Sequence, residues 1–156
     1  MAGRLSTKKN KPAASSAADP KLIDGLAWYR LLTIRQAAWL CSASEELVGE
    51  RFRVLNRQGL IGLLNQPRML GPRVHWLTPK GVALAIDYAA ERGETIQLTA
   101  PKNGFSAGEH LRQRIGIVDC HLGLRAWAGA SRATVEGFRV EFEANPQGLL
   151  AKALSY

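Results

Sequence analysis

The chain has 156 residues, of which 46% are hydrophobic and 22% charged, a composition typical of one globular domain with an extension. It contains no apolar run near the ~20 residues that a membrane-spanning helix needs, and its basic, polar amino-terminal segment argues against a signal peptide. We therefore expect a soluble, cytoplasmic protein with no membrane partner. Cys41 and Cys120 are expected to be reduced thiols of helical core segments, with a disulfide as the less favoured alternative.

The formal net charge of +8 is unevenly distributed along the chain. Residues 1–21 and 22–81 each have a net charge of +4, whereas residues 82–156 are neutral. A basic half beside a neutral half indicates a surface that binds a polyanion, joined to a partner-binding or structural remainder. A basic surface that is merely solvated would give the same composition.

The first 58 residues predict an unstructured arm followed by three helices. Residues 1–21 mix Lys, Ser, Ala and Pro without periodicity, so we expect a disordered basic arm. The apolar spacing predicts a first helix over Leu22–Leu32 and a short second helix over Ile34–Cys41, which Thr33 caps. A third helix is predicted over Glu45–Gln58. Its cap is either Ser42 or Ser44, and Gly59 is placed to end it.

A hairpin and a fourth helix are predicted next. Leu60–Leu64 and Arg73–Leu77 read as strands on either side of a turn-rich segment. Thr78 and Pro79 then begin a helix that reaches Arg92. The predicted fold is therefore α+β and mainly helical, with a winged helix-turn-helix domain over residues 22–93.

Residues 94–156 predict a helical extension with a strand and a possible dimerisation region. Short strands are expected at Thr95–Thr99 and Val135–Phe142, and a helical turn at Leu149–Leu154. A capping box of Ser106 and Glu109 would open a long helix that ends near Trp127. This helix has an apolar stripe, which consists of Leu111, Ile115, Val118 and Leu122. The stripe packs either on the domain core or against a second copy of the chain.

The third helix is the expected recognition helix, because the second helix of a helix-turn-helix pair enters the DNA major groove. If Val48, Phe52 and Leu55 face the core, Arg53 lies opposite and is the best candidate for a contact to a guanine edge. The hairpin adds Arg68 and Arg73 as minor-groove or phosphate contacts, and Lys80 is expected to hold a phosphate together with Thr78. The predicted DNA-binding residues are Thr33, Arg35, Ser44, Gly49, Arg51, Arg53, Arg57, Arg68, Arg73 and Lys80.

Three acidic residues on the same helix oppose this prediction, since carboxylates repel phosphates. Glu45 and Glu46 are partly explained by the helix dipole, which favours acids in the first turn. Glu50 is expected to pair with Arg53 or Arg57, or to accept a hydrogen bond from cytosine.

Four stretches resemble known DNA-binding proteins. Residues 33–40 (TIRQAAWL), 56–61 (NRQGLI) and 75–81 (HWLTPKG), with the Val48, Phe52 and Leu55 spacing, look like the winged-helix pattern of bacterial regulators. The later residues 110–111 (HL) and 117–119 (IVD) are similar to the replication-relaxation family, although His-Leu-Arg stands where that family often has His-Asp-Leu. The resemblance implies a DNA-binding protein of a plasmid or mobile element, linked to replication, mobilisation or transfer. It supplies no catalytic site.

We expect no enzyme, cofactor or metal site. His110 and His121 are eleven residues apart, which on one helix is roughly 16 Å and too far to share a metal. Glu141 and Glu143 have no lysine at nuclease spacing, and no glycine-rich phosphate loop is present.

The sequence thus predicts a double-stranded DNA-binding accessory or regulatory protein, dimeric, that serves transcription, replication or conjugative transfer. The alternative is a winged-helix module that has lost DNA binding and docks a relaxase, replication or secretion protein.

Overall fold

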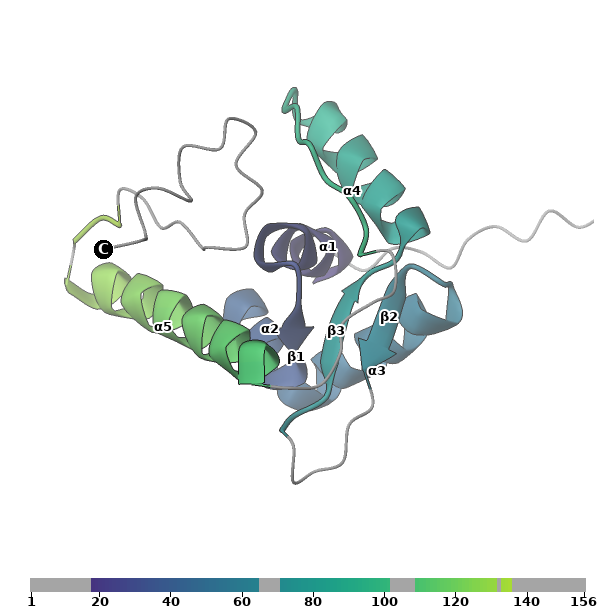
Figure 1. Cartoon of the computed structure of the whole chain (residues 1–156). Helices are drawn as coiled ribbons and strands as arrows, with labels where there is room; N and C mark the ends of the chain where they lie inside the picture. Colours follow the sequence, from purple (N-terminus) through teal and green to yellow (C-terminus); the bar gives the residue numbers. More distant parts are fainter. Residues whose placement is uncertain (1–17, 65–70, 102–108, 132, 136–156) are drawn as a thin grey trace, which may run out of the picture.

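The computed structural model describes residues 18–64, 71–101, 109–131 and 133–135. The described residues form an α+β, mainly helical fold in which a small antiparallel sheet is packed among helices, as the sequence predicted (Figure 1). The elements in chain order are α1 (Ala18–Tyr29), β1 (Leu32–Thr33), α2 (Ile34–Cys41), α3 (Glu45–Arg57), β2 (Ile61–Leu64), β3 (Val74–Leu77), α4 (Pro79–Glu91) and α5 (Glu109–Ser131).

The sheet has one strand more than the predicted hairpin. Its strand order is β1-β3-β2, and both pairings are antiparallel. In the hairpin, Leu63 lies opposite His75 and Ile61 opposite Leu77. The two-residue strand β1 pairs Leu32 with His75 and Thr33 with Val74, so β3 is central. The start of α2 is thereby held beside the start of β3.

The first helix is displaced from its predicted range of Leu22–Leu32. It begins at Ala18, where Asp19 lies in the first turn and favours the helix dipole. It ends at Tyr29 because Arg30 adopts a left-handed backbone conformation with φ of 67°. Leu32 consequently belongs to the sheet.

The predicted caps of α2 and α4 are confirmed, and of the two candidates for α3 Ser44 is the cap, whereas Ser42 ends α2 in a left-handed conformation. Thr33, Ser44 and Thr78 each accept a hydrogen bond from a backbone N–H in the first turn of α2, α3 and α4. Gly59 follows α3 with φ of 72°, the left-handed conformation that a glycine adopts at little cost. The three caps thus fix where α2, α3 and α4 begin, and Gly59 fixes where α3 ends and the hairpin begins.

The main core is formed by side chains from the sheet and from all five helices. Its largest fully buried side chains include Tyr29 and Leu22 from α1 and Phe52 and Leu55 from α3. Helix α1 packs against α2 and α4, and α3 packs against α2 and β2. The apolar face that the sequence assigned to α3, Val48, Phe52 and Leu55, is almost completely buried.

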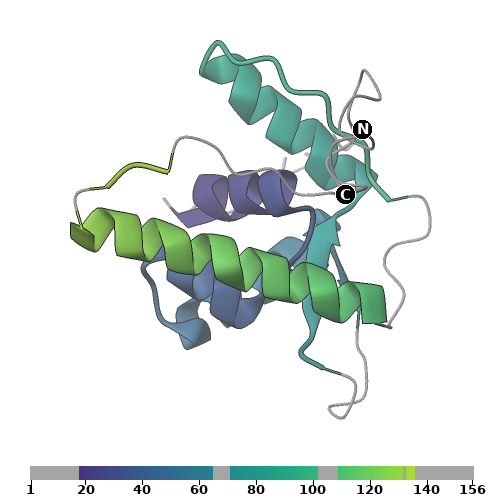
Figure 2. The ribbon, with the colours of Figure 1, turned by 60° about the vertical axis from the view of Figure 1, so that its left-hand side comes forward.

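Helix α5 packs against α2 and β1 (Figure 2), contacts α1 through His121 and Tyr29, and extends to Ser131, beyond the predicted end at Trp127. Leu111, Val118 and Leu122 are at most 4% exposed, and Ile115 packs partly buried beside Leu111. Of the two readings of this stripe, packing on the core of the same chain is the one observed. The alternative prediction, a dimer interface along this stripe, is wrong because other residues of the same chain cover the stripe.

The segment after α4 is not the predicted strand. Thr95–Thr99 has no regular secondary structure and runs back along α4 (Figures 1 and 2). Ile96 and Leu98 pack partly buried against the main core, which explains their alternation without a neighbouring strand. Val135 is not in a strand, and residues 136–142, 149–154, Ser106 and the arm before residue 18 lie outside the described residues.

The two cysteines are free thiols, but only one approaches the expected core position. Cys41 is half-buried, and burial raises the pKa of its thiol. Cys120 is exposed on α5, so its prediction as a core thiol was wrong. Among the helices described, none combines the length and apolar character needed to cross a membrane.

Alanine substitutions at Gly81 and, as a control, at Gly116 test the packing between α4 and the hairpin. A Cβ at Gly81 would lie 2.0 Å from the carbonyl oxygen of Leu60, whereas one at Gly116 has no neighbour within 4 Å. We predict that Gly81→Ala lowers the free energy of unfolding by about 2 kcal/mol or more, because backbone must move. Gly116→Ala should raise it by up to about 1 kcal/mol through helix propensity. Urea unfolding checks both, and an unchanged midpoint for Gly81→Ala would contradict the packing.

Candidate nucleic-acid interface

The exposed face of α3 is the centre of the candidate interface. With Val48, Phe52 and Leu55 buried, the exposed residues of the helix are Glu45, Glu46, Leu47, Glu50, Arg53, Asn56 and Arg57. Gly49 is half-buried, and a Cβ there would lie 3.8 Å from Ile34 Cδ1 of α2. Gly49 therefore sits where α3 approaches α2, at the margin of the exposed face.

Two predicted contact residues are helix caps. Thr33 is 5% exposed, and its hydroxyl accepts a hydrogen bond from the Gln36 N–H at 3.2 Å. Ser44 is exposed, and its hydroxyl accepts from the Leu47 N–H at 3.2 Å. Thr33 therefore positions α2 from within the core, whereas Ser44 also presents its side chain to solvent.

Arg51 has an intramolecular partner that the local sequence does not predict. Its Nε donates to Asp19 Oδ1 at 2.9 Å, and its terminal nitrogen forms an ion pair with the other carboxylate oxygen. Asp19 is 6% exposed, so this bidentate pair fastens the first turn of α1 to α3. The hydrogen bond to Asp19 raises the pKa of Arg51 above its ordinary value.

Arg53 and Arg57 are exposed on the carboxyl-terminal half of α3. Their guanidinium Nε atoms donate to backbone carbonyls one turn earlier, to Gly49 at 3.3 Å and to Arg53 at 3.4 Å. Such long bonds to carbonyls on an exposed helix leave both guanidinium groups at the surface.

Lys80 joins these arginines. Its Nζ donates to the Gln58 carbonyl at 2.8 Å, next to Arg57 at the end of α3. We name Arg53, Arg57 and Lys80 the helix-end cluster. The hydroxyl of Thr78, which was expected to hold a phosphate with Lys80, instead contacts the Gly59 carbonyl at 2.6 Å and caps α4. Of the two residues expected to hold a phosphate, only Lys80 therefore has a side chain that is exposed for this contact.

Three further exposed arginines are close in sequence to the residues where β1, β3 and α5 meet. Arg73 precedes Val74, which packs with Leu31 and Leu111 in a small apolar cluster. Arg35, two residues after the Thr33 that pairs with Val74, is exposed on α2. Arg112, next to Leu111 on α5, is exposed as well. We name Arg35, Arg73 and Arg112 the hairpin-end group.

Arg112 was absent from the predicted interface. Its place depends on the packing of Leu111 against the sheet, a contact made across distant parts of the sequence. The apolar stripe of α5 predicted that Leu111 is buried, but not what covers it. Arg68 of the predicted hairpin tip lies outside the described residues.

The acidic residues of α3 lie on its amino-terminal half. Glu45, Glu46 and Glu50 are exposed, and within the described parts of the chain Glu50 forms no ion pair with Arg53 or Arg57. Of the two alternatives for Glu50, the pairing with an arginine is not observed, because both arginines donate to backbone carbonyls; the contact to cytosine stays a prediction. The surface of α3 is thus acidic where it begins and basic where it ends.

A buried histidine supports α3 from below. His75 of β3 is 5% exposed, and its ring lies 4.3 Å from the ring of Phe52, centroid to centroid. The pKa of His75 is lowered to about 4, chiefly by burial; a backbone hydrogen bond with Leu32 opposes this shift and the charge of Arg73 adds to it. His75 Nδ1 has no hydrogen-bond partner among the described residues, so the ring is neutral at pH 7.

The remaining histidines are separated, as their spacing predicted. His110 is exposed, while His121 is buried, and its Nδ1 lies 2.9 Å from the hydroxyl of Tyr29. Burial raises the pKa of Tyr29, in keeping with a neutral hydroxyl in this bond. In the ranges that the structure describes, no three His, Cys, Asp or Glu side chains are grouped closely enough to bind a metal ion.

No protein-family model, curated protein or solved structure matches this chain. The assignment of function consequently depends on the chain's own residues and on their arrangement.

The buried His75 predicts how stability depends on pH. Its folded-state pKa is about 4 and its ordinary value is 6.5, so between these values the unfolded chain binds a proton that the folded chain does not. The free energy of unfolding should therefore fall as pH drops from 6.5 to 4, by about 3 kcal/mol at most. Urea unfolding across this range measures the slope.

His75→Phe is the matched variant, because it keeps an aromatic ring beside Phe52 and cannot titrate. The free energy of unfolding of the natural chain should fall relative to that of the variant as pH drops from 6.5 to 4. A constant difference from pH 6.5 to 4 would contradict a buried, neutral His75.

Proposed function

We propose that the chain is a non-enzymatic, double-stranded DNA-binding protein with a winged helix-turn-helix domain. The observation on which the proposal depends is the basic, exposed half of α3, which lies beside a hairpin in the order α1, α2, α3, β2, β3, α4. In proteins with this order, α3 enters the major groove and the hairpin lies along the neighbouring backbone or minor groove.

Charge supports a polyanion as the partner. Between Arg51 and Ile86 the sequence has six basic residues and no acidic one. Of these, Arg53, Arg57, Arg73 and Lys80 have exposed side chains, and Arg51 is held by Asp19. Phosphate contacts made by such side chains release counterions and provide affinity for any sequence.

Sequence preference would come from Arg53. Its guanidinium group is exposed on the face of α3 opposite the buried stripe, and an arginine fork bonds both major-groove acceptors of guanine. The hairpin-end group and Arg68 would then contact phosphates or the minor groove.

We further propose that the protein acts in transcription, replication or conjugative transfer of a plasmid or mobile element. This part of the proposal depends only on the resemblance of its sequence to the replication-relaxation family. Binding as a homodimer to two half-sites is part of the same proposal. Because the stripe of α5 is covered within the chain, a dimer would use other residues.

One observation favours a second candidate, a winged-helix module that docks a protein. Glu45, Glu46 and Glu50 present acidic groups on the half of α3 that leads into the groove in DNA-bound helices. A basic patch on a relaxase, replication or secretion protein would match them.

Charge-removing variants test the DNA interface. We predict that Arg53→Ala relaxes base preference, with a loss of about 1–3 kcal/mol on the preferred duplex. Arg68→Ala and Arg73→Ala should each weaken binding to all sequences and reduce the slope of log affinity against log salt by about one. Gel shifts over a salt series, on duplexes selected from a random pool, measure both effects.

Arg92→Ala is the control for these variants. Arg92 is exposed at the end of α4 and pairs with Asp24 and Glu94, away from both basic groups. For Arg92→Ala, the slope of log affinity against log salt should equal that of the natural chain. Equal slopes for Arg73→Ala and Arg92→Ala would remove the hairpin from the interface.

Fluorescence anisotropy with a random duplex at low salt separates the two candidates. A DNA-binding protein gives saturable, salt-sensitive binding, whereas a docking module gives little. If the natural chain shows no binding to the duplex at low salt, the second candidate is favoured, in which the acidic half of α3 contacts a protein.

A further inference from the structure

Two large aromatic side chains are exposed on neighbouring helices. Trp127 of α5 is 60% exposed, and Trp39 of α2 is 47% exposed. They belong to one surface, because a Cβ built at Gly123 would lie 4.0 Å from the Trp39 ring, and Gly123 is one turn before Trp127 on α5. Leu124, three residues before Trp127, adds a side chain that is 41% exposed. Continuous apolar surface of this kind commonly marks a protein contact.

The side of α5 that carries Trp127 is directed away from the fold. Positions 116, 120, 123 and 127 recur at helical spacing, and they lie opposite the buried Leu111, Val118 and Leu122. In Figure 2, α5 runs across the front of the molecule, and no other described helix or strand lies in front of it. We name the following residues the outer face: Gly116, Cys120, Gly123, Leu124 and Trp127 of α5, with Trp39 of α2.

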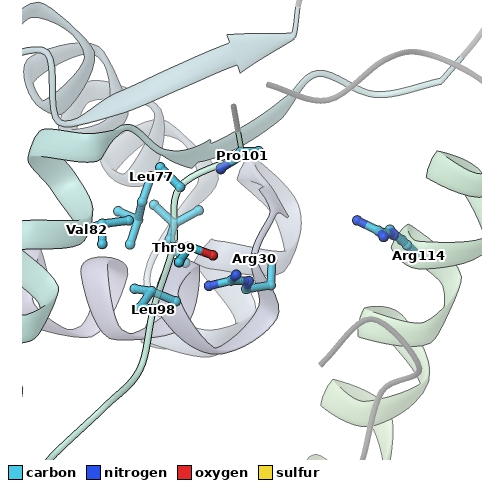
Figure 3. A pocket seen from close by; sticks show the side chains of 9 residues that line it. Arg30, Leu77, Val82, Leu98, Thr99, Pro101 and Arg114 are labelled. Carbon is cyan, nitrogen blue, oxygen red and sulfur yellow. The ribbon is translucent and has the colours of Figure 1, made fainter. Parts of the chain in front are cut away.

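The outer face has no charged side chain, although the chain has a formal net charge of +8. Between residues 113 and 131, the charged residues are Arg114, Asp119 and Arg125. Arg114 extends from α5 toward side chains of α1 (Figure 3), and Asp119 Oδ1 accepts from Gln36 Nε2 at 2.9 Å. Burial and then the charge of Arg125 lower the pKa of His121, which lies on the α1 side of α5. Two basic chains can therefore approach each other at this face with little repulsion.

Large and small residues are placed reciprocally on the outer face. Gly116 is eleven residues before Trp127, roughly 16 Å along the helix, and a Cβ at Gly116 would meet nothing within 4 Å. Cys120 and Gly123 lie between them, with the same midpoint in the sequence. If two α5 helices pack antiparallel about a two-fold axis at this midpoint, Trp127 of each copy lies against Gly116 of the other. Two-fold interfaces require such reciprocity, so the outer face is complementary to itself.

We propose that the outer face binds a second copy of this chain, in a two-fold dimer whose α5 helices pack antiparallel. Trp127 of each copy packs on Gly116 of the other, Cys120 lies opposite Gly123, and Trp39 extends the contact on the α2 side. The dimer gives the proposed DNA-binding protein a way to span two half-sites. It forms without DNA, so it does not depend on the proposed function.

The area of the outer face indicates how strong the dimer is. Helix α5 has 23 residues, so its face is about 35 Å long and about 10 Å wide, or roughly 350 Å². The exposed part of Trp39 adds on the order of 100 Å². Two copies together bury about 900 Å², near the lower limit of specific interfaces. We therefore expect a weak, reversible dimer, with a Kd of roughly 1–100 μM.

Sedimentation velocity of the full chain without DNA, from about 1 to 500 μM, measures this association. We expect a monomer–dimer equilibrium in the natural chain. Trp127→Ala should weaken it at least tenfold, because a tryptophan at the centre of an interface commonly provides much of the binding energy. Trp127 is mostly exposed in the single chain, so this variant should fold normally.

Gly116→Leu separates the reciprocal packing from nonspecific apolar association. Leucine adds apolar surface and has open space in the single chain, but it occupies the place of the partner's Trp127. Dimerisation should therefore weaken at least tenfold. Gly129→Leu is the matched control, because Gly129 is exposed, also has nothing within 4 Å of a Cβ, and lies outside the outer face. Its association constant should equal that of the natural chain.

Gly123→Cys tests the antiparallel register. On oxidation by air with a copper–phenanthroline catalyst, the introduced thiol should form a disulfide with the partner's Cys120, which peptide mapping identifies. A chain that stays monomeric at the highest concentration overturns the proposal, because another molecule or residues 136–156 then cover the face. Equal association of Gly116→Leu and Gly129→Leu, or a dimer without the disulfide, also overturns it.

Discussion

The side-chain amide of Gln36 connects three parts of the fold that are far apart in the sequence. Gln36 is 1% exposed and completes the capping box of α2, with its Oε1 accepting from the Thr33 N–H at 3.0 Å. Its Nε2 donates to the Ile115 carbonyl and to Asp119 Oδ1 of α5, each at 2.9 Å. Because a buried amide without partners is costly, these bonds fix α5 on α2 in one arrangement.

This arrangement determines where the basic side chains emerge. Thr33, bonded to Gln36, pairs with Val74 in the sheet, and Val74 shares a small buried cluster with Leu111 of α5. Arg35, Arg73 and Arg112 follow from these contacts as the hairpin-end group. The helix-end cluster depends instead on the turn at Gly59, which brings Lys80 to the end of α3. A duplex that contacts α3 would have to accommodate the exposed acidic residues on its first half.

Local signals predicted most of the fold. The caps at Thr33, Ser44 and Thr78 and the left-handed Gly59 each act within a few residues, so the boundaries of α2, α3 and α4 followed from the sequence. The start of α1 did not, because Asp19 is held by Arg51, which lies in another helix. The strand β1 has two residues and no periodicity of its own, and it exists because β3 offers an edge.

The candidate site was less predictable than the fold. Arg53, Arg57, Arg73 and Lys80 could be selected by charge and spacing, and all are exposed. Thr33 and Arg51 were chosen by the same reasoning, yet the chain uses them internally, and only tertiary contacts reveal this. Arg112 could not be predicted as an interface residue, because its position relative to the hairpin depends on how α5 packs on the rest of the chain.

Chemical-shift mapping of the full chain with a short random-sequence duplex tests the central claim most directly. We predict that amide shifts on DNA addition concentrate in α3, in the residues around Arg35 and Arg73 and in the first turn of α5, and that they weaken as salt is added. Shifts confined to α4 and residues 94–101, or no shifts at low salt, would contradict the proposed interface.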